Sequence, residues 1–529
     1  MRVPTCINKN CLKVYDINTK LFKQLDAKVI KAYEFEKWHL PIPNTLQEIC
    51  VETIAKNWID NPILDEIVLL EDRYLLLDLL PENLPLELTI PRIADEVYWK
   101  KCYLKRWPKK RPKIQSDLPL HHFVKNGINQ INQEFLQKEL SIEEDVSAIE
   151  KSSVRTASKS TRSRSSSKVA SRKSSLKTVE EERKEEKTST WKKCYIEMHV
   201  QEYLENLKPE NYDPEKMKSL CDLCGSFVEI LRIDQMLCSE NSPNKLPLNA
   251  IVTGFQNLRE LSICFKQTYA KESFSWKILT TTYQDIKLFA KGLERIRLQT
   301  LRITNSDIDC DKTIIILKAL LKHDLEILDF SSCKVGNRGM IGIAKFILEH
   351  PVSDILLVNN RIGHKGITAL AYALNQKSQN VQKINLRLNQ TSDETGNLLM
   401  NVISQNNSKL KWLSLASCGL STNFEVCKYL KINKCLEYLD VSNNVLGEEI
   451  GKEILSALQY NGTLTKLDTR MCKMPSLLDA QIQAEVEKNR YGRKKQTCTE
   501  SIIEDFKWNE DILKEMDEIL LESIENVED

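Results

Sequence analysis

Cysteine and histidine are the residue types in this chain that most directly suggest chemistry. Cys221 and Cys224 have the CxxC spacing of half a zinc site, but zinc needs a second cysteine pair or histidine ligands. The sequence offers none nearby, and the pair falls in a helical pattern, so we expect both side chains to pack in a core. The seven histidines, which include His121, His122 and His323, stand beside no nucleophile or metal-ligand pattern. Because the chain also lacks a GxxxxGK[ST] phosphate loop, we predict no catalytic site, cofactor or metal.

Recognition of another protein is the chemistry that the sequence favours instead. Trp412 and Tyr438 occupy the same position in two successive copies of a repeated sequence phrase, and two arginines share another position. Aromatic residues and arginine are typical of the side chains that dominate protein interfaces. In the alternative interpretation, the aromatic side chains only pack against an adjacent copy. We predict a protein-binding surface at Asn385, Arg387, Trp412, Tyr438, Asp440, Asp468 and Arg470.

The repeated phrase must position these side chains. It has apolar residues at its first, fourth, sixth and eleventh positions, with Thr as a substitute at Thr391 and Thr469, and it has Asn, Cys or once Ser at its ninth. The period of about 28 residues lies in the leucine-rich-repeat range. The seven copies begin at Leu298, Leu325, Val352, Val381, Leu410, Leu436 and Leu464.

The spacing of the phrase predicts one short strand and one turn in each copy. The fourth and sixth residues alternate like a strand and point into one core. Asn360, Asn389 and Asn444 at the ninth position can bond the open backbone groups of the turn, and cysteines fill the same position as small hydrophobes. We expect positive backbone angles at the turn glycines Gly336, Gly339, Gly363 and Gly366.

A helical segment follows each phrase, for example over residues 339–348. One strand and one helix cannot bury their apolar faces alone, so the copies must stack to form a core. The pattern therefore predicts an α/β leucine-rich-repeat solenoid. It resembles the ribonuclease-inhibitor class, a horseshoe with strands on its concave side.

Composition divides the chain into five predicted domains. Apolar residues at helical spacing, interrupted by proline, indicate an all-helical N-terminal domain. A helical cap with a long helix over 220–236 precedes the repeats and covers their exposed end. The predicted domains are residues 1–115 (helical), 116–190 (disordered Ser/Lys/Arg-rich linker), 191–290 (helical N-terminal cap), 291–495 (leucine-rich repeats) and 496–529 (acidic amphipathic C-terminal helix).

Two segments outside the repeats leave several interpretations open. Residues 151–178 contain eleven serines, nine Lys or Arg and no acidic residue, so they cannot bury enough surface to fold. They serve as a solvated linker, as a contact for an acidic surface such as tubulin or nucleic acid, or as a phosphorylation switch. The acidic cluster over 180–186 weakens the nucleic-acid interpretation. The C-terminal helix either caps the last repeat or docks on a partner.

The net charge, the lengths of the apolar runs and the cysteine usage all indicate an intracellular protein. The 529-residue chain has a net charge of +2, so no global field indicates nucleic acid or a membrane. Its start has no apolar run of signal-peptide length, and its other apolar runs are too short to span a bilayer. Several of the 16 cysteines fall at core positions of repeats, where a reduced thiol is at home. We expect a soluble protein without disulfides.

Two stretches outside the repeats carry a more specific resemblance. One comprises Asn61-Pro62-Ile63-Leu64, Asn83-Leu84-Pro85-Leu86-Glu87-Leu88-Thr89, Tyr98-Trp99-Lys100-Lys101-Cys102 and Arg106-Trp107. The other runs from Trp191-Lys192-Lys193-Cys194-Tyr195 to Leu231-Arg232-Ile233-Asp234-Gln235-Met236-Leu237. With the repeats, they resemble the T-complex-associated testis-expressed protein 1 family, also called dynein regulatory complex subunit 5. The resemblance covers about residues 45–107 and 191–490.

The resemblance implies a non-enzymatic subunit of the nexin–dynein regulatory complex in the axoneme of motile cilia and sperm flagella. Its implied partners are other subunits of that complex and, directly or indirectly, doublet microtubules, with no small-molecule substrate, nucleic acid or membrane. The family brings no binding residue that can be carried over individually. Two alternatives are a Ran-type GTPase-activating leucine-rich-repeat protein and a ubiquitin-ligase substrate adaptor with an F-box-like N-terminus.

Overall fold

The computed structural model describes residues 45–110, 190–239, 243–267, 276–376, 380–405, 408–491 and 508–520. The expectations for residues 1–44, for the linker up to residue 189 and for much of the acidic tail lie outside the described residues. In the described ranges, no helix combines the length and the apolar character that crossing a membrane requires. The division into five domains stays a prediction.

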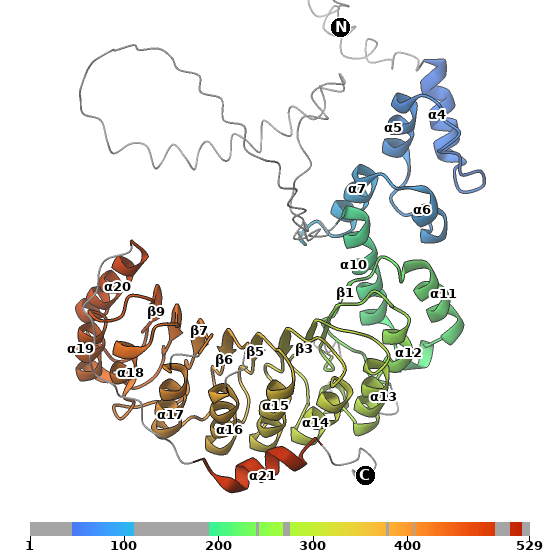
Figure 1. The fold of residues 1–529 in the computed structure, drawn as a ribbon. Coiled ribbons are helices and arrows are strands. Elements are labelled where there is room, and N and C mark those ends of the chain that lie inside the picture. The colour runs from blue at the N-terminus through green and yellow to red at the C-terminus, as the bar shows by residue number, and fades with distance from the viewer. Residues whose placement is uncertain are drawn as a thin grey trace, which may run out of the picture.

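A curved parallel sheet of nine strands forms the inner wall of a horseshoe (Figure 1). The middle residue of each repeat strand, such as Leu328, Ile355 or Leu439, is fully buried against the helices. This arrangement confirms the predicted α/β leucine-rich-repeat fold. The strands lie side by side in sequence order: β1 (Ile230–Ile233), β2 (Glu260–Ile263), β3 (Thr300–Ile303), β4 (Ile327–Asp329), β5 (Asp354–Leu356), β6 (Lys383–Asn385), β7 (Trp412–Ser414), β8 (Tyr438–Asp440) and β9 (Lys466–Asp468).

Helices between the strands, and one helix after the last strand, cover the convex side (Figure 1). Neighbouring helices approach closely at small residues, because a Cβ atom on Gly366 would lie only 2.9 Å from the Cβ of Met340. The strands and helices therefore share one core, as the stacking argument requires. The convex helices are α12 (Leu248–Thr253), α13 (Tyr283–Leu293), α14 (Cys310–Ala319), α15 (Asn337–Glu349), α16 (His364–Asn375), α17 (Asp393–Ile403), α18 (Val426–Ile432), α19 (Gly447–Ala457) and α20 (Ser476–Arg490).

The ninth position of the repeat links each copy to the one before it. From the second copy to the seventh, its side chain donates to the backbone carbonyl at the sixth position of the preceding copy. Asn444 Nδ2 lies 2.9 Å from the carbonyl oxygen of Leu415, as predicted for asparagine. Cys418 Sγ lies 3.2 Å from the carbonyl oxygen of Leu386. The cysteines therefore act as hydrogen-bond donors as well as small buried side chains.

The residue before this position, the eighth of the repeat, has the left-handed conformation. Its φ lies between 48° and 61° in all seven copies, which are Asn305, Ser332, Asn359, Leu388, Ser417, Asn443 and Met471. The expectation of positive angles at the four turn glycines is wrong, because φ is −106° at Gly336 and −116° at Gly363. Gly339 and Gly366 lie in helices, where the closeness of the preceding helix and turn excludes a side chain. Asparagine and serine suit the eighth position because their short polar side chains tolerate this conformation.

The segment before the repeats contains sheet as well as helix. It consists of α10 (Trp191–Asn206), a 3-10 turn η1 (Pro209–Asn211), α11 (Pro214–Cys224), β1, α12, β2 and a 3-10 turn η2 (Trp276–Leu279). The prediction of one helix over 220–236 is wrong, because α11 ends at Cys224. Leu231 and Ile233 of β1 pair with Leu261 and Ile263 of β2. A short, mostly apolar window fits both helical and strand spacing, which explains the error.

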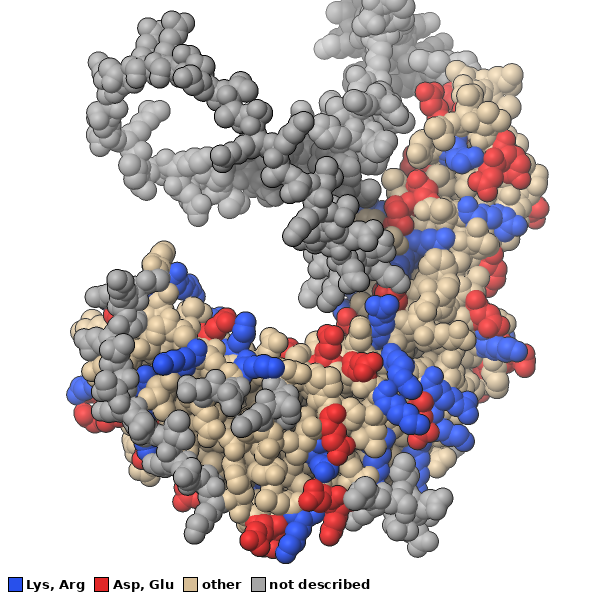
Figure 2. All heavy atoms as spheres, in the orientation of Figure 1, with Lys and Arg blue, Asp and Glu red and all other residues tan. Residues whose placement is uncertain are grey.

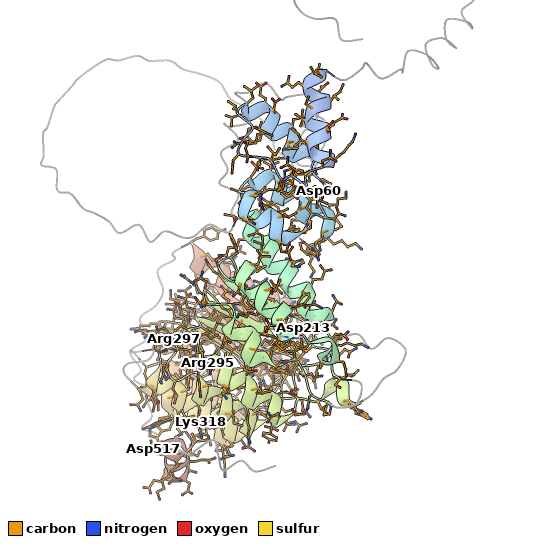
Figure 3. The ribbon with its side chains drawn as sticks, turned by 90° about the vertical axis from the view of Figure 1, so that its right-hand side faces the viewer. Asp60, Asp213, Arg295, Arg297, Lys318 and Asp517 are labelled. Carbon is orange, nitrogen blue, oxygen red and sulfur yellow. The ribbon has the colours of Figure 1, made fainter. Side chains whose placement is uncertain are left out.

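Four helices form the N-terminal module, defined here as residues 45–110: α4 (Leu46–Lys56), α5 (Leu70–Leu79), α6 (Leu86–Arg92) and α7 (Glu96–Arg106). Helix α7 packs along α10, so the module stands directly on the first turn of the horseshoe (Figures 1 and 3). The two stretches that carry the family resemblance therefore form one packed unit. In Figure 3, Asp60 marks the module, Asp213 the segment below it and Asp517 the helix on the convex side of the horseshoe.

The acidic tail contributes helix α21 (Glu510–Glu518), which lies across α15 and α16 on the convex side (Figure 1). Its buried residues Ile512, Met516 and Ile519 join a small apolar cluster with Ala344 and Ala369. Small side chains on α15 and α16 leave room for this helix. The tail therefore folds back onto α15 and α16, so the alternative in which it covers the last repeat is wrong. Helix α20 packs at that end, against α19 and β9.

Candidate protein-binding surface

The register of the sheet assembles the predicted protein-binding residues. Strands alternate their side chains, so the first and third residues of each repeat strand face the open concave side. Lys383, Trp412, Tyr438 and Lys466 pair in register across β6 to β9 and form one row. The third residues form a second row, which consists of Asn385, Ser414, Asp440 and Asp468. All seven predicted residues therefore lie on or next to four adjacent strands.

Trp412 and Tyr438 stack face to face at the centre of the first row. Their ring centroids are 4.8 Å apart and their planes differ by 10°. This separation equals the distance between neighbouring strands, so the sheet itself brings the rings into contact. Burial, and then the nearby Asp440 and Asp468, raises the pKa of Tyr438, which stays a neutral phenol. The structure thus confirms that the aromatic residues of adjacent copies pack together.

Two lysines that the sequence analysis missed complete this row. Lys383 Nζ lies 5.0 Å from the ring centroid of Trp412, and Lys466 Nζ lies 5.1 Å from that of Tyr438. Both distances are within the range of cation–π attraction. Their position in the repeat, two residues after its first apolar residue, is the same as that of Trp412 and Tyr438. This shared position is the sequence feature that places the two lysines in the same row as the rings.

The second row is more polar, and its carboxylates are engaged. Asp440 is buried and accepts hydrogen bonds from the Ser414 hydroxyl at 2.9 Å and the Ser442 backbone N–H at 3.0 Å. Arg470 pairs with Asp468 at 2.6 Å. That hydrogen bond holds the pKa of the Asp468 carboxyl below its usual value. Both acidic side chains are therefore engaged by neighbouring groups.

Asn385 and Arg387 lie at the other end of the candidate surface. The Asn385 side-chain oxygen accepts from the Arg387 backbone N–H at 3.2 Å, which fixes the amide beside its own turn. The Arg387 side chain is exposed. This surface therefore combines stacked rings, two lysines and an arginine with paired carboxylates, a composition suited to binding another protein.

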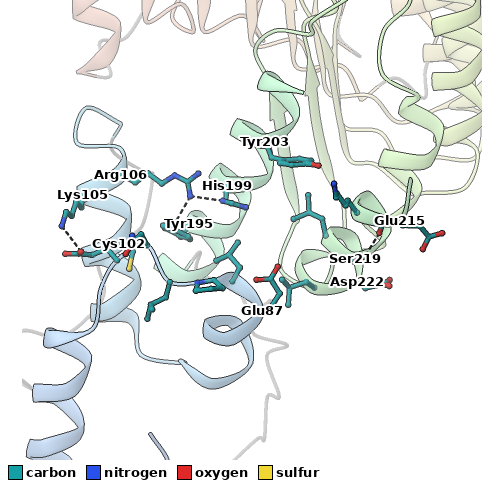
Figure 4. Close-up of a pocket in the computed structure, with 18 residues that line it drawn as sticks. Glu87, Cys102, Lys105, Arg106, Tyr195, His199, Tyr203, Glu215, Ser219 and Asp222 are labelled. Carbon is teal, nitrogen blue, oxygen red and sulfur yellow. Dashed lines mark hydrogen bonds and ion pairs between the residues drawn. The ribbon is translucent and has the colours of Figure 1, made fainter. Parts of the chain in front are cut away.

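A second concavity lies where the N-terminal module meets α10 and α11 (Figure 4). This cleft of about 1340 Å³ has Arg106 on its wall, which donates to the Tyr195 hydroxyl at 3.2 Å and pairs with Glu202 at 2.7 Å. Burial, followed by the Arg106 charge, lowers the pKa of His199. Burial raises the pKa of the Cys102 thiol, which therefore stays protonated. These groups tie α7 and α10 together.

Cys221, Cys224 and His323 are buried parts of the core. Burial raises the pKa of Cys221 to about 11 and that of Cys224 to about 12, so neither is a thiolate at neutral pH. His323 is buried between two repeats, where Nδ1 accepts from the Leu298 backbone N–H at 3.0 Å. Among the described residues, no three Cys, His, Asp or Glu side chains gather as a metal site would require.

The sheet, the convex helices and the hydrogen bonds between copies define a leucine-rich-repeat protein of the ribonuclease-inhibitor type. In agreement, the chain is 28% identical to mouse ribonuclease inhibitor over 189 residues, which cover 35% of this chain and 40% of that protein. An internalin from Listeria monocytogenes has a TM-score of only 0.30 at 15% identity, over 52% of this chain and 87% of the internalin. No family model matches the chain.

More specifically, the chain is similar to dynein regulatory complex subunit 5, which confirms the resemblance drawn from the sequence. It is 26% identical to the Macaca fascicularis protein over 365 residues, which cover 64% of this chain and 58% of that protein. It is also 26% identical to the Chlamydomonas reinhardtii protein over 280 residues, which cover 50% of this chain and 49% of that protein. The chain spans about half the length of the curated relatives it matches.

Proposed function

We propose that this chain is a non-enzymatic structural subunit of the nexin–dynein regulatory complex in the axonemes of motile cilia and sperm flagella. There it helps to regulate dynein-driven sliding of doublet microtubules. The single observation that supports this most is the similarity to relatives named dynein regulatory complex subunit 5, in species as distant as Macaca fascicularis and Chlamydomonas reinhardtii.

The architecture suits a scaffold that holds several partners at fixed positions. The N-terminal module, the segment before the repeats and the repeats share one hydrophobic core, so they form one continuously packed platform. Figure 2 shows acidic and basic side chains interspersed over its visible face, without one dominant charge. Such a surface suits contacts with other subunits more than with nucleic acid or a membrane. Contact with doublet microtubules is direct or through those subunits.

The concave surface over β6 to β9 is the proposed contact for another subunit. Asn385, Arg387, Trp412, Tyr438, Asp440, Asp468 and Arg470 lie together there. Trp412 and Tyr438 supply the aromatic centre, and the charged groups form a rim, which is the usual anatomy of a protein interface.

Fractionation of motile cilia tests the proposed function. After detergent removes the membrane and soluble matrix, the chain is expected to stay with the axoneme until high salt dissociates the regulatory complex. Recovery of the chain only in the soluble fraction would contradict the proposal. Two further outcomes would favour other functions: stimulated GTP hydrolysis by Ran, or binding of residues 45–107 to the linker subunit of a ubiquitin ligase.

A further inference from the structure

The row of four side chains on β6 to β9 has an electrostatic character that its composition alone does not reveal. Trp412 and Tyr438 use one face on each other and the other face on a lysine ammonium group. The ring edges are therefore left to face the open concave side. Because the edge of an aromatic ring is its positive part, the whole row is apolar and electropositive.

The two lysines differ from Lys411 in making no close ion pair with a carboxylate in the described ranges. Lys411, one residue before Trp412, pairs with Glu437 at 3.4 Å. By contrast, no carboxylate in the described ranges comes within ion-pair distance of Lys383 or Lys466, which contact the rings instead. Asp440 and Asp468 nearby are engaged by Ser414 and Arg470. Lys383 and Lys466 thus keep their charges outside any close ion pair, although Asp354 is the register partner of Lys383 and Asp468 lies near Lys466.

We infer that this row binds an acidic segment of another protein, in which an apolar side chain lies between two carboxylates. The inference rests on the proposed scaffold function and names the chemistry of one partner. The apolar side chain covers the ring edges of Trp412 and Tyr438, and the carboxylates pair with Lys383 and Lys466. Partial desolvation by the apolar side chain strengthens both ion pairs.

The strand spacing sets the separation of the two carboxylates. Lys383 and Lys466 are three strands apart, and strands lie about 4.8 Å apart, so their positions are about 14 Å apart. An extended segment advances about 3.3 Å per residue, so carboxylates four residues apart match this distance. The expected segment therefore has Glu or Asp at both ends of a five-residue stretch, with an apolar residue at its centre.

A binding assay with the whole 529-residue chain tests this inference. The probe is a fluorescein-labelled peptide, Gly-Ser-Glu-Ser-Leu-Ser-Glu-Ser-Gly, and its control has lysine in place of both glutamates. We expect fluorescence anisotropy to show saturable binding of the glutamate peptide that weakens with salt, and no binding of the lysine peptide. Equal binding of the two peptides, or no binding of either, would overturn the inference.

Three matched variants locate the site. Lys383→Gln and Lys466→Gln each remove one unpaired charge and are expected to weaken glutamate-peptide binding about two- to fivefold. Lys411→Gln removes the same charge from the residue next to Trp412, where it belongs to an existing ion pair, and it is expected to leave binding within about twofold. Equal loss in all three variants would mean that only net charge matters. If the peptide does not bind while the unaltered chain stays with axonemes, the inference fails and the proposed function stands.

Discussion

Trp99 in α7 packs against Tyr195 in α10, with ring centroids 5.3 Å apart, although the 111–189 segment separates them in sequence. The Lys192 ammonium group donates to the backbone carbonyls of Ile90 and Ile93 at 2.7 and 3.0 Å, so it joins α10 to the end of α6. The N-terminal module is therefore anchored to the horseshoe by both apolar and polar contacts.

Replacing Trp99 with alanine should separate the module from the horseshoe. The ring is 1% exposed and its indole N–H donates to the Ile93 carbonyl, so the loss is expected to cost about 3–5 kcal/mol. Hydrogen exchange should become faster in α10 as well as in α7. Trp58→Ala is the matched control, because Trp58 is equally buried but lies beside α4. Faster exchange of α10 in the control, or none in Trp99→Ala, would contradict a specific joint at Trp99.

At the ninth position of the repeat, a side chain that can donate a hydrogen bond should stabilise the fold more than one that cannot. Asn444→Ala leaves the Leu415 carbonyl and the Cys418 and Leu420 backbone N–H groups without their partner, at a cost of about 2–4 kcal/mol. Asn444→Cys keeps a donor of the kind that other copies use and should cost less. Urea denaturation of both variants measures the difference. Equal destabilisation would show that the thiol donor contributes nothing.

Helix α21 should detach from the convex side without unfolding the repeats. Met516→Asp places a charge in the cluster around Ala344 and Ala369, and its desolvation is not compensated there. Hydrogen exchange should become fast over residues 508–520 and stay slow in the strands. Glu518→Ala, on the exposed side of α21, should leave exchange unchanged. Unfolding of β4 to β6 in Met516→Asp would mean that the helix is part of the repeat core.

His323 should make the repeats less stable in acid. Its Nδ1 accepts from Leu298 and its Nε2 contacts the Leu293 carbonyl at 3.0 Å, so the folded state needs the neutral ring with the proton on Nε2. Burial lowers the His323 pKa to about 4, below the unfolded value of about 6.5. Its contribution is therefore complete above pH 6.5 and is lost as the pH falls toward 4.

The size of this effect follows from the two pKa values. Between pH 7 and pH 5, the free energy of unfolding of the natural chain should fall by about 2 kcal/mol relative to His323→Gln. The comparison is needed because burial raises the pKa of Glu197 to about 7, which acts in the opposite direction in both proteins. Parallel pH profiles for the two proteins would contradict the tautomer assigned to His323.

The repeated part of the fold could be predicted well from the sequence because the same spacing of apolar residues recurs in every copy. The apolar positions of Leu328, Ile355 and Leu439 recur with a nearly constant period and are buried in the structure. A copy that is ambiguous by itself can therefore be assigned by comparison with its neighbours. β1 and the place of α21 escaped prediction for the opposite reason. A single apolar stretch around Leu231 fits either a helix or a strand, and the amphipathic tail does not specify which surface it covers.

The candidate surface was predictable only in part. Trp412 and Tyr438 stood out by residue type and repeat position, and the sheet places them in contact. Lys383 and Lys466 occupy the same position, but lysine on a surface is ordinary, and only the ring contacts distinguish these two. The joint at Trp99 was not foreseeable from local pattern, because it depends on packing between distant helices.

Cross-linking of intact, detergent-extracted axonemes with a lysine-reactive reagent tests the central claim, a repeat scaffold that holds other subunits, most directly. We predict that Lys383 and Lys466 of the concave side link to another subunit of the dynein regulatory complex. Links confined to this chain itself, in axonemes where other subunits of the complex are linked to one another, would contradict it.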